Sequence, residues 1–117
     1  MAKVLVVDDD LDNAQTLAYL LKGMGHEVQF SLTAKHGMEV AEKIRPEVVI
    51  LDLVLPDADG CSLAAEIKKR QVNKPRIIAV TGHGSEVLRQ RALDSGCDLF
   101  LEKPVNPALL DRLLLEH

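Results

Sequence analysis

Carboxylates follow directly after two of the most apolar runs in the sequence. Asp52 comes after residues 48–51 (VVIL), and Asp8 and Asp9 come after residues 3–7 (KVLVV). Such runs are typical of strands that are buried on both faces of a parallel sheet. Because a carboxylate at the end of a buried strand is costly without a partner, we expect these aspartates to have a chemical role.

A hydroxyl and a cation follow two further apolar runs. Thr81 comes after residues 76–80 (RIIAV), and Lys103 comes after residues 98–102 (DLFLE). The carboxyl ends of parallel strands meet at one edge of a sheet, so these side chains should converge with the aspartates. Two carboxylates about 4 Å apart repel each other by roughly 4 kcal/mol at an effective dielectric constant near 20. Since Lys103 can offset only part of this repulsion, the cluster should also bind a proton or a metal ion.

The donor set favours a hard metal ion and phosphate chemistry. Carboxylate oxygens without a His or Cys close by in the sequence favour Mg²⁺, with Mn²⁺ as an alternative, over zinc or copper. A metal held by few carboxylates keeps open positions, which suits phosphate oxygens. Asp52 could then act as a nucleophile and form an acyl phosphate, while Lys103 and the Thr81 hydroxyl hold the phosphoryl oxygens.

The elements that would position these residues alternate along the chain. Apolar, β-branched runs predict five strands, at 3–7, 27–31, 47–51, 76–80 and 98–102. Amphipathic spacing predicts five helices between and after them, at about 11–24, 34–44, 60–71, 85–95 and 107–114. Such alternation predicts a doubly wound α/β fold, a three-layer sandwich with a parallel sheet between helices on both faces.

Four motifs then point to a known family. LVVDDD, VILDLVLPDADG, AVTG and LFLEKP occur in this order within residues 3–114 and together resemble the receiver domain of two-component response regulators. The resemblance implies a flavodoxin-like (βα)5 fold with five parallel strands in the order 2-1-3-4-5. It also implies Mg²⁺-dependent acceptance of a phosphoryl group from a histidine kinase or a histidine phosphotransfer protein. The domain would be a self-phosphorylating switch in a phosphorelay rather than a conventional enzyme.

The resemblance also assigns roles in the phosphorylation site. Asp52 would be the phosphoacceptor and, with Asp9, a direct metal ligand. Asp8 would bind the metal through water, and the backbone carbonyl of Val54 would be a further ligand. Lys103 would pair with the phosphate.

The same resemblance implies a switch and three loop positions. Thr81 would be the switch residue that responds to phosphate, and Phe100 matches an aromatic position whose side chain turns inward on activation. Because Phe100 alternates with core residues, a purely structural packing role fits it as well. The loop positions typical of the family are matched by Pro56, Gly60 and the cis-linked Pro104.

Three other functions fit the sequence less well. A phosphatase of the haloacid dehalogenase class needs a second Asp two residues after the nucleophile, where this chain has Val54. A flavodoxin-type cofactor binder needs a phosphate cradle rich in Ser, Thr and Gly after the first strand, whereas residues 8–13 (DDDLDN) would repel phosphate. The remaining alternative is a receiver-like protein-interaction module that works without phosphorylation.

Composition limits the partners and the compartment. The formal net charge is -4 and no block of Lys or Arg occurs, which argues against direct nucleic-acid binding. No run approaches the roughly 18 apolar residues that a membrane span needs. Cys61 and Cys97 are far apart in sequence, which suits a reducing cytosol, so we expect a cytoplasmic domain.

The wider context of the chain stays open. It could be a stand-alone regulator or the receiver of a hybrid sensor histidine kinase, which RPEVVILDLVLPDADG and TGHG resemble somewhat more. A homodimer would use the fourth helix, the fifth strand and the fifth helix. Residues 115–117 (LEH) look like the start of an expression tag, which leaves residues 1–114 as the receiver domain.

Local expectations concern helix starts and histidines. Asp10 and Asp12 are expected to be solvated or to cap the first helix rather than to bind metal, and Asp59 is expected to be the N-cap of the third helix. His26, His36 and His83 show no spacing typical of metal ligands and are expected at the surface.

Overall fold

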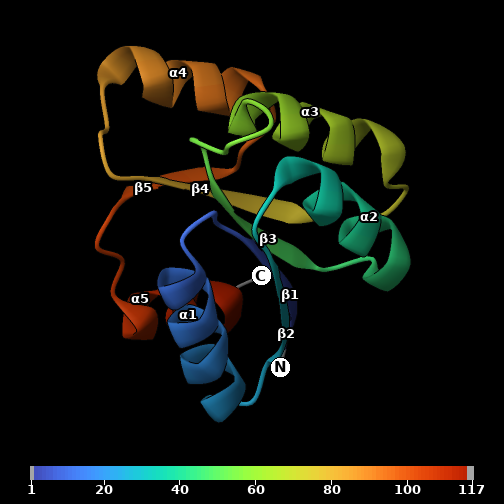
Figure 1. Cartoon of the computed structure of the whole chain (residues 1–117), viewed down its shortest axis with the longest axis vertical. Coiled ribbons are helices and arrows are strands. Elements are labelled where there is room, and N and C mark those ends of the chain that lie inside the picture. Colours follow the sequence, from blue (N-terminus) through green and yellow to red (C-terminus); the bar gives the residue numbers. More distant parts are fainter. Residues whose placement is uncertain (1, 116–117) are drawn as a thin grey trace.

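A parallel sheet lies at the centre of the computed structural model, which describes residues 2–115. Within these residues the sheet has five strands in the order β2-β1-β3-β4-β5, as predicted. Figure 1 shows the strands passing between two layers of helices. The strands are β1 (Lys3–Val7), β2 (Glu27–Ser31), β3 (Val48–Asp52), β4 (Arg76–Thr81) and β5 (Leu99–Glu102).

The helices cover both faces of the sheet. Residues of α1 and α5 pack into one hydrophobic cluster, and residues of α2, α3 and α4 pack into the other. Each expected helix is present, with ends shifted by at most one residue, so the predicted three-layer (βα)5 fold is confirmed. The helices are α1 (Leu11–Gly23), α2 (Ala34–Ile44), α3 (Gly60–Arg70), α4 (Glu86–Asp94) and α5 (Pro107–Leu115).

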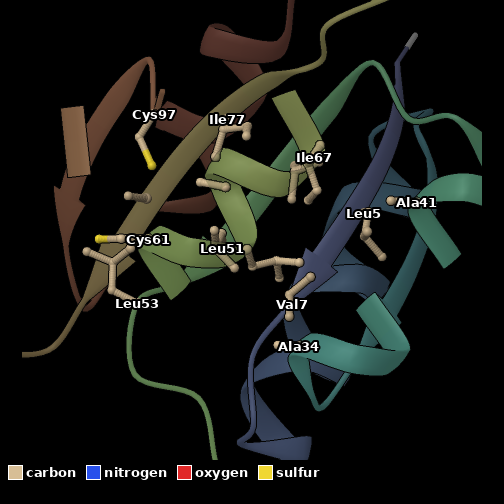
Figure 2. Packing of buried hydrophobic residues seen from close by; sticks show 14 of the residues in the cluster. Leu5, Val7, Ala34, Ala41, Leu51, Leu53, Cys61, Ile67, Ile77 and Cys97 are labelled. Carbon is tan, nitrogen blue, oxygen red and sulfur yellow. The ribbon is translucent and has the colours of Figure 1, made fainter. Parts of the chain in front are cut away.

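The side chains of β1 explain why its sequence is apolar without alternation. Leu5 and Val7 face the α2–α4 side, where Figure 2 shows Val7 near Leu51, whereas Val4 and Val6 face α1 and α5. Successive side chains of a strand point to opposite faces, and both faces are covered here. A continuous apolar run is therefore needed to fill both halves of the core.

Side-chain caps fix the helix starts close to the sheet edge. Asp10 accepts a hydrogen bond from the Asn13 N–H at 3.2 Å, and Asp59 accepts one from the Cys61 N–H at 2.9 Å. The predicted Asp59 cap is thus confirmed, and of the two roles left open for Asp10, solvated or capping, the structure shows capping. Capping bonds of this kind satisfy N–H groups that have no partner inside the helix, so they define where α1 and α3 begin.

One histidine prediction is wrong. His36 and His83 are exposed, but His26 is buried, with 5% of its surface accessible. Its Nδ1 accepts a hydrogen bond from the Ala2 N–H at 3.0 Å, and its Nε2 lies 2.7 Å from Asp111 Oδ1. His26 therefore ties the start of β1 to α5, a contact between segments far apart in sequence.

Both cysteines are buried thiols, which gives a simple test of the packing. Burial raises the pKa of Cys97 to about 12, with the nearby Cys61 and Asp98 adding to the effect, and burial also raises the pKa of Cys61. Alkylation needs an accessible thiolate. We expect iodoacetamide at pH 8 to leave both cysteines unmodified in the folded protein and to modify both in urea. Rapid labelling of the native protein, measured by intact mass, would contradict this packing.

Leu115 is the last residue of α5, and residues 116–117 lie outside the described part of the chain, so the tag assignment for 115–117 stays a prediction. None of the helices in residues 2–115 is long and apolar enough to cross a membrane.

Candidate functional site

The strand register brings the predicted site residues to one edge of the sheet. Val7 of β1 pairs with Leu51 of β3, so the residues that follow them, Asp8 and Asp52, lie side by side. Thr81 is the last residue of β4, the next strand along. The predicted convergence at the carboxyl ends of the strands is thus observed.

Three carboxylates form a compact acidic cluster. Asp8, Asp9 and Asp52 each offer one oxygen within 4.8 Å of the others. Asp8 and Asp52 are buried, whereas Asp9 is exposed. This set of hard oxygen donors is open to solvent on the Asp9 side, which suits a divalent cation.

Backbone hydrogen bonds orient the two buried carboxylates. Asp8 Oδ1 accepts from the Asp10 N–H at 2.9 Å, and Asp52 Oδ1 accepts from the Val54 N–H at 3.0 Å. Each aspartate therefore bonds the backbone two residues further on, a local arrangement that Asp readily adopts. Their Oδ2 atoms are left to face a common partner.

That common partner is Lys103. Its Nζ lies 2.9 Å from Asp52 Oδ2 and 3.0 Å from Asp8 Oδ2. Partial burial works to lower the pKa of Lys103, but the hydrogen bonds and charges of Asp52 and Asp8 outweigh it and raise the pKa. The lysine is therefore a firmly held cation at neutral pH, and it neutralises part of the charge of the cluster.

Thr81 is held close to the lysine by the backbone. The Lys103 N–H donates to the carbonyl of Thr81 at 2.8 Å, and the Thr81 hydroxyl accepts from the His83 N–H at 3.3 Å. The Thr81 side chain is buried. The Lys103–Pro104 peptide bond is cis, as predicted.

The loop between β3 and α3 carries three of the predicted positions. Val54 is exposed and forms an isolated antiparallel bridge with Asp59, while Pro56 lies exposed in the loop between them. Gly60 begins α3, where a Cβ atom would lie 2.6 Å from the Asp52 carbonyl oxygen and 2.6 Å from Cα of Leu53. Only glycine permits this close approach of the helix to the strand end.

Phe100 is half-buried on β5, where it pairs with Ala79 of β4 and packs against the core on the α2–α4 side. This position fits the packing role that the sequence left open. Its role as a switch stays a prediction.

Two contacts of the β3–α3 loop were not anticipated from the sequence. Asp57 accepts hydrogen bonds from backbone N–H groups at the start of α2. Arg91 of α4 forms an ion pair with Asp59. Neither contact could be predicted from the sequence, because a partner that lies in another helix leaves no local pattern.

A cavity of about 520 Å³ borders the site. Its lining includes Asp8, Asp52 and Lys103 of the site, together with Leu17 and Leu20 of α1. The cavity therefore lies between α1 and the segment that follows β5, next to the buried carboxylates.

Two curated proteins are similar to this chain in sequence. The chain is 33% identical to an uncharacterised 14.6 kDa protein of Leptolyngbya boryana over 97% of this chain and 88% of that protein. It is also 33% identical to the transcriptional regulatory protein CpxR homolog of Haemophilus influenzae, over 91% of this chain. The chain spans only 45% of the length of that regulator.

Solved structures of response regulator proteins are similar to this chain in fold. A CheY-like response regulator receiver domain protein from Methanospirillum hungatei matches with a TM-score of 0.92 and 30% identity, over 99% of this chain and 92% of that chain. A Burkholderia pseudomallei response regulator, solved with a phosphorylated aspartic acid, a calcium ion and citrate, matches with a TM-score of 0.90 and 30% identity, over 97% of this chain and 66% of that chain.

Fold and site together define a doubly wound α/β domain with an acidic cluster and a lysine at the carboxyl edge of its sheet. The family model for the response regulator receiver domain matches residues 4–114, and the chain belongs to this family.

Proposed function

We propose that this receiver domain accepts a phosphoryl group on Asp52 from a phosphohistidine of a histidine kinase or histidine phosphotransfer protein. The observation that carries the proposal is the contact of Lys103 with both Asp52 and Asp8 inside the acidic cluster. Asp52 is oriented by the Val54 N–H, and it lines the neighbouring cavity. The Burkholderia relative with a phosphorylated aspartic acid supports the same chemistry.

The acidic cluster fits a divalent cation, Mg²⁺ or alternatively Mn²⁺. The donors are carboxylate oxygens within 4.8 Å of one another, and Lys103 supplies a single positive charge against three negative ones. Asp9 and Asp52 would hold the ion directly, the Val54 carbonyl would add a ligand, and Asp8 would act through water. When bound, the ion neutralises negative charge on the phosphoryl oxygens.

The transfer step requires little beyond positioning and charge. A carboxylate oxygen of Asp52 forms the new O–P bond as the P–N bond of the donor breaks. The electron pair of that bond returns to the donor imidazole, which takes up one proton. Lys103 and the Thr81 hydroxyl would hold the phosphoryl oxygens while charge redistributes.

The consequences of phosphorylation lie on the α4–β5–α5 side. Movement of Thr81 towards the phosphate would vacate space for Phe100 and change the surface of α4 and β5. That surface could mediate a homodimer, and a cytoplasmic location suits this signalling role. Since the chain spans under half of the Haemophilus regulator, the output and the origin, stand-alone or hybrid kinase, are left to experiment.

Intact mass tests the proposal directly. After incubation with Mg²⁺ and acetyl phosphate, we expect the parent protein to gain one phosphoryl group. Asp52→Asn should gain none, and a chelator should prevent the gain in the parent. No gain in folded parent protein would reject the phosphoacceptor function and favour an interaction module that works without phosphorylation.

A further inference from the structure

The β3–α3 loop reaches across to a second helix through one exposed carboxylate. Asp57 Oδ1 accepts from the Ala34 N–H at 2.8 Å, and Asp57 Oδ2 accepts from the Lys35 N–H at 3.0 Å. The side chain thus spans the first two N–H groups of α2. Those hydrogen bonds to Lys35 and Ala34 lower the pKa of Asp57, so the anchoring group is a carboxylate at neutral pH.

The start of α2 also has a cap of its own. The Thr33 hydroxyl accepts from the His36 N–H at 3.1 Å, and the Thr33 carbonyl accepts from the Gly37 N–H at 2.9 Å. The first four N–H groups of the helix are therefore all satisfied, two of them by Asp57 from a different element. Two caps of separate origin allow the helix-capping role and the loop-anchoring role of Asp57 to be tested apart.

The anchored loop is the one that carries the phosphoacceptor. Val54 stands two residues after Asp52 and three before Asp57, and its N–H donates to Asp52 Oδ1 at 3.0 Å. At the base of the loop the Gly60 N–H donates to the Leu53 carbonyl at 3.1 Å. A shift of the loop tip would therefore reorient both the Asp52 carboxylate and the backbone of Val54.

We propose that Asp57 is a positioning residue that clamps the β3–α3 loop to α2 and thereby holds the Asp52–Val54 segment in place for cation binding. The cation part of this inference rests on the proposed function. The clamp acts through the loop backbone, since Asp57 itself is not among the clustered carboxylates. Direct hydrogen-bond partners of metal ligands typically change metal affinity by about ten- to a hundredfold, and Asp57, which acts one step further out through the loop backbone, is expected at the lower end of that range.

The test compares Asp57→Ala with Thr33→Ala, which removes a capping bond of the same helix without touching the loop. We expect both variants to lower the melting temperature. Only Asp57→Ala should accelerate amide exchange of Val54 and Gly60 in metal-free protein, measured by NMR. Only Asp57→Ala should raise the Kd for Mg²⁺, by about tenfold in calorimetric titration. Asp57→Asn keeps one acceptor oxygen and should lie between the parent and Asp57→Ala.

The two readouts separate the clamp from the proposed function. If Asp57→Ala and Thr33→Ala behave alike in amide exchange and in Mg²⁺ affinity, Asp57 is only a helix cap and the clamp is overturned. If the parent binds no Mg²⁺ while Asp57→Ala still loosens Val54, the clamp stands and the metal site of the proposed function fails. Faster exchange in Asp57→Ala with an unchanged Kd would overturn the link to cation binding.

Discussion

Gly60→Ala is expected to lower the free energy of unfolding by about 2 to 3 kcal/mol, in the range of overpacked core positions. The added methyl would lie 2.6 Å from the Asp52 carbonyl oxygen and 2.6 Å from Cα of Leu53. Both obstacles are backbone atoms, which cannot swing away as a side chain can. Either α3 must move away from β3, or the end of β3 must shift.

The same shift should impair phosphorylation, because the displaced segment carries Asp52. A misplacement of about 1 Å can cost a hundredfold in rate. We expect Gly60→Ala to gain phosphate from acetyl phosphate at least tenfold more slowly than the parent, measured by intact mass over time.

Gly23→Ala is the matched control for Gly60→Ala. Gly23 ends α1, and a Cβ built there meets no atom within 4 Å. Since alanine is favoured over glycine in helices, this variant should be neutral or slightly more stable, with an unchanged rate. Equal effects of the two substitutions in urea unfolding would show that the close approach at Gly60 carries no cost.

Most of the fold and the core of the site could be predicted because they depend on local signals. Apolar runs marked the strands, and the residues at their ends were bound to converge once the strands were parallel. Asp8, Asp52 and Lys103 meet for that reason, although only the structure gives the contact of one lysine with both carboxylates. The Asp59 cap could be predicted in the same way, because the type of residue before a helix indicates where the helix starts.

What could not be predicted depends on contacts across the fold. His26 was expected at the surface, yet it is buried against Asp111, a partner 85 residues away. The bonds of Asp57 to the start of α2 have the same origin, because hydrogen bonding between a loop and another helix leaves no periodic pattern. Phe100 is a different case, since alternation along β5 fits packing and switching alike, and its place in the core fits the packing role.

Lys103→Met should nearly abolish phosphoryl transfer while making stability depend more strongly on Mg²⁺. Lys103 is the cation that contacts Asp8 and Asp52, so its loss removes a charge that would stabilise the transferring group. Removing one such donor typically costs about a hundredfold or more in rate. We expect the phosphorylation rate of Lys103→Met, followed by mass, to fall by at least that factor.

The stability effect follows from the same charges. Without the lysine, Asp8 and Asp52 repel each other more strongly, so the variant should unfold more easily in metal-free buffer. An ion that binds only the folded protein stabilises it in proportion to the logarithm of its concentration over its Kd. The uncompensated carboxylates attract a cation more strongly. Millimolar Mg²⁺ should therefore raise the melting temperature more in Lys103→Met than in the parent.

Lys68→Met provides the control. Lys68 Nζ lies 2.9 Å from Asp98 Oδ2, and neither residue belongs to the acidic cluster. Loss of an exposed pair costs roughly 0 to 1 kcal/mol, and Mg²⁺ should act on Lys68→Met as on the parent.

The raised pKa of Lys103 means that its ion pairs persist from neutral pH up past the usual lysine pKa and are lost only as the pH rises through the raised value. The difference in free energy of unfolding between Lys103→Met and the parent should therefore be constant from about pH 7 to about pH 9. If Mg²⁺ raises the melting temperature of Lys103→Met no more than that of the parent, then Lys103 and the cation do not bind the same carboxylates.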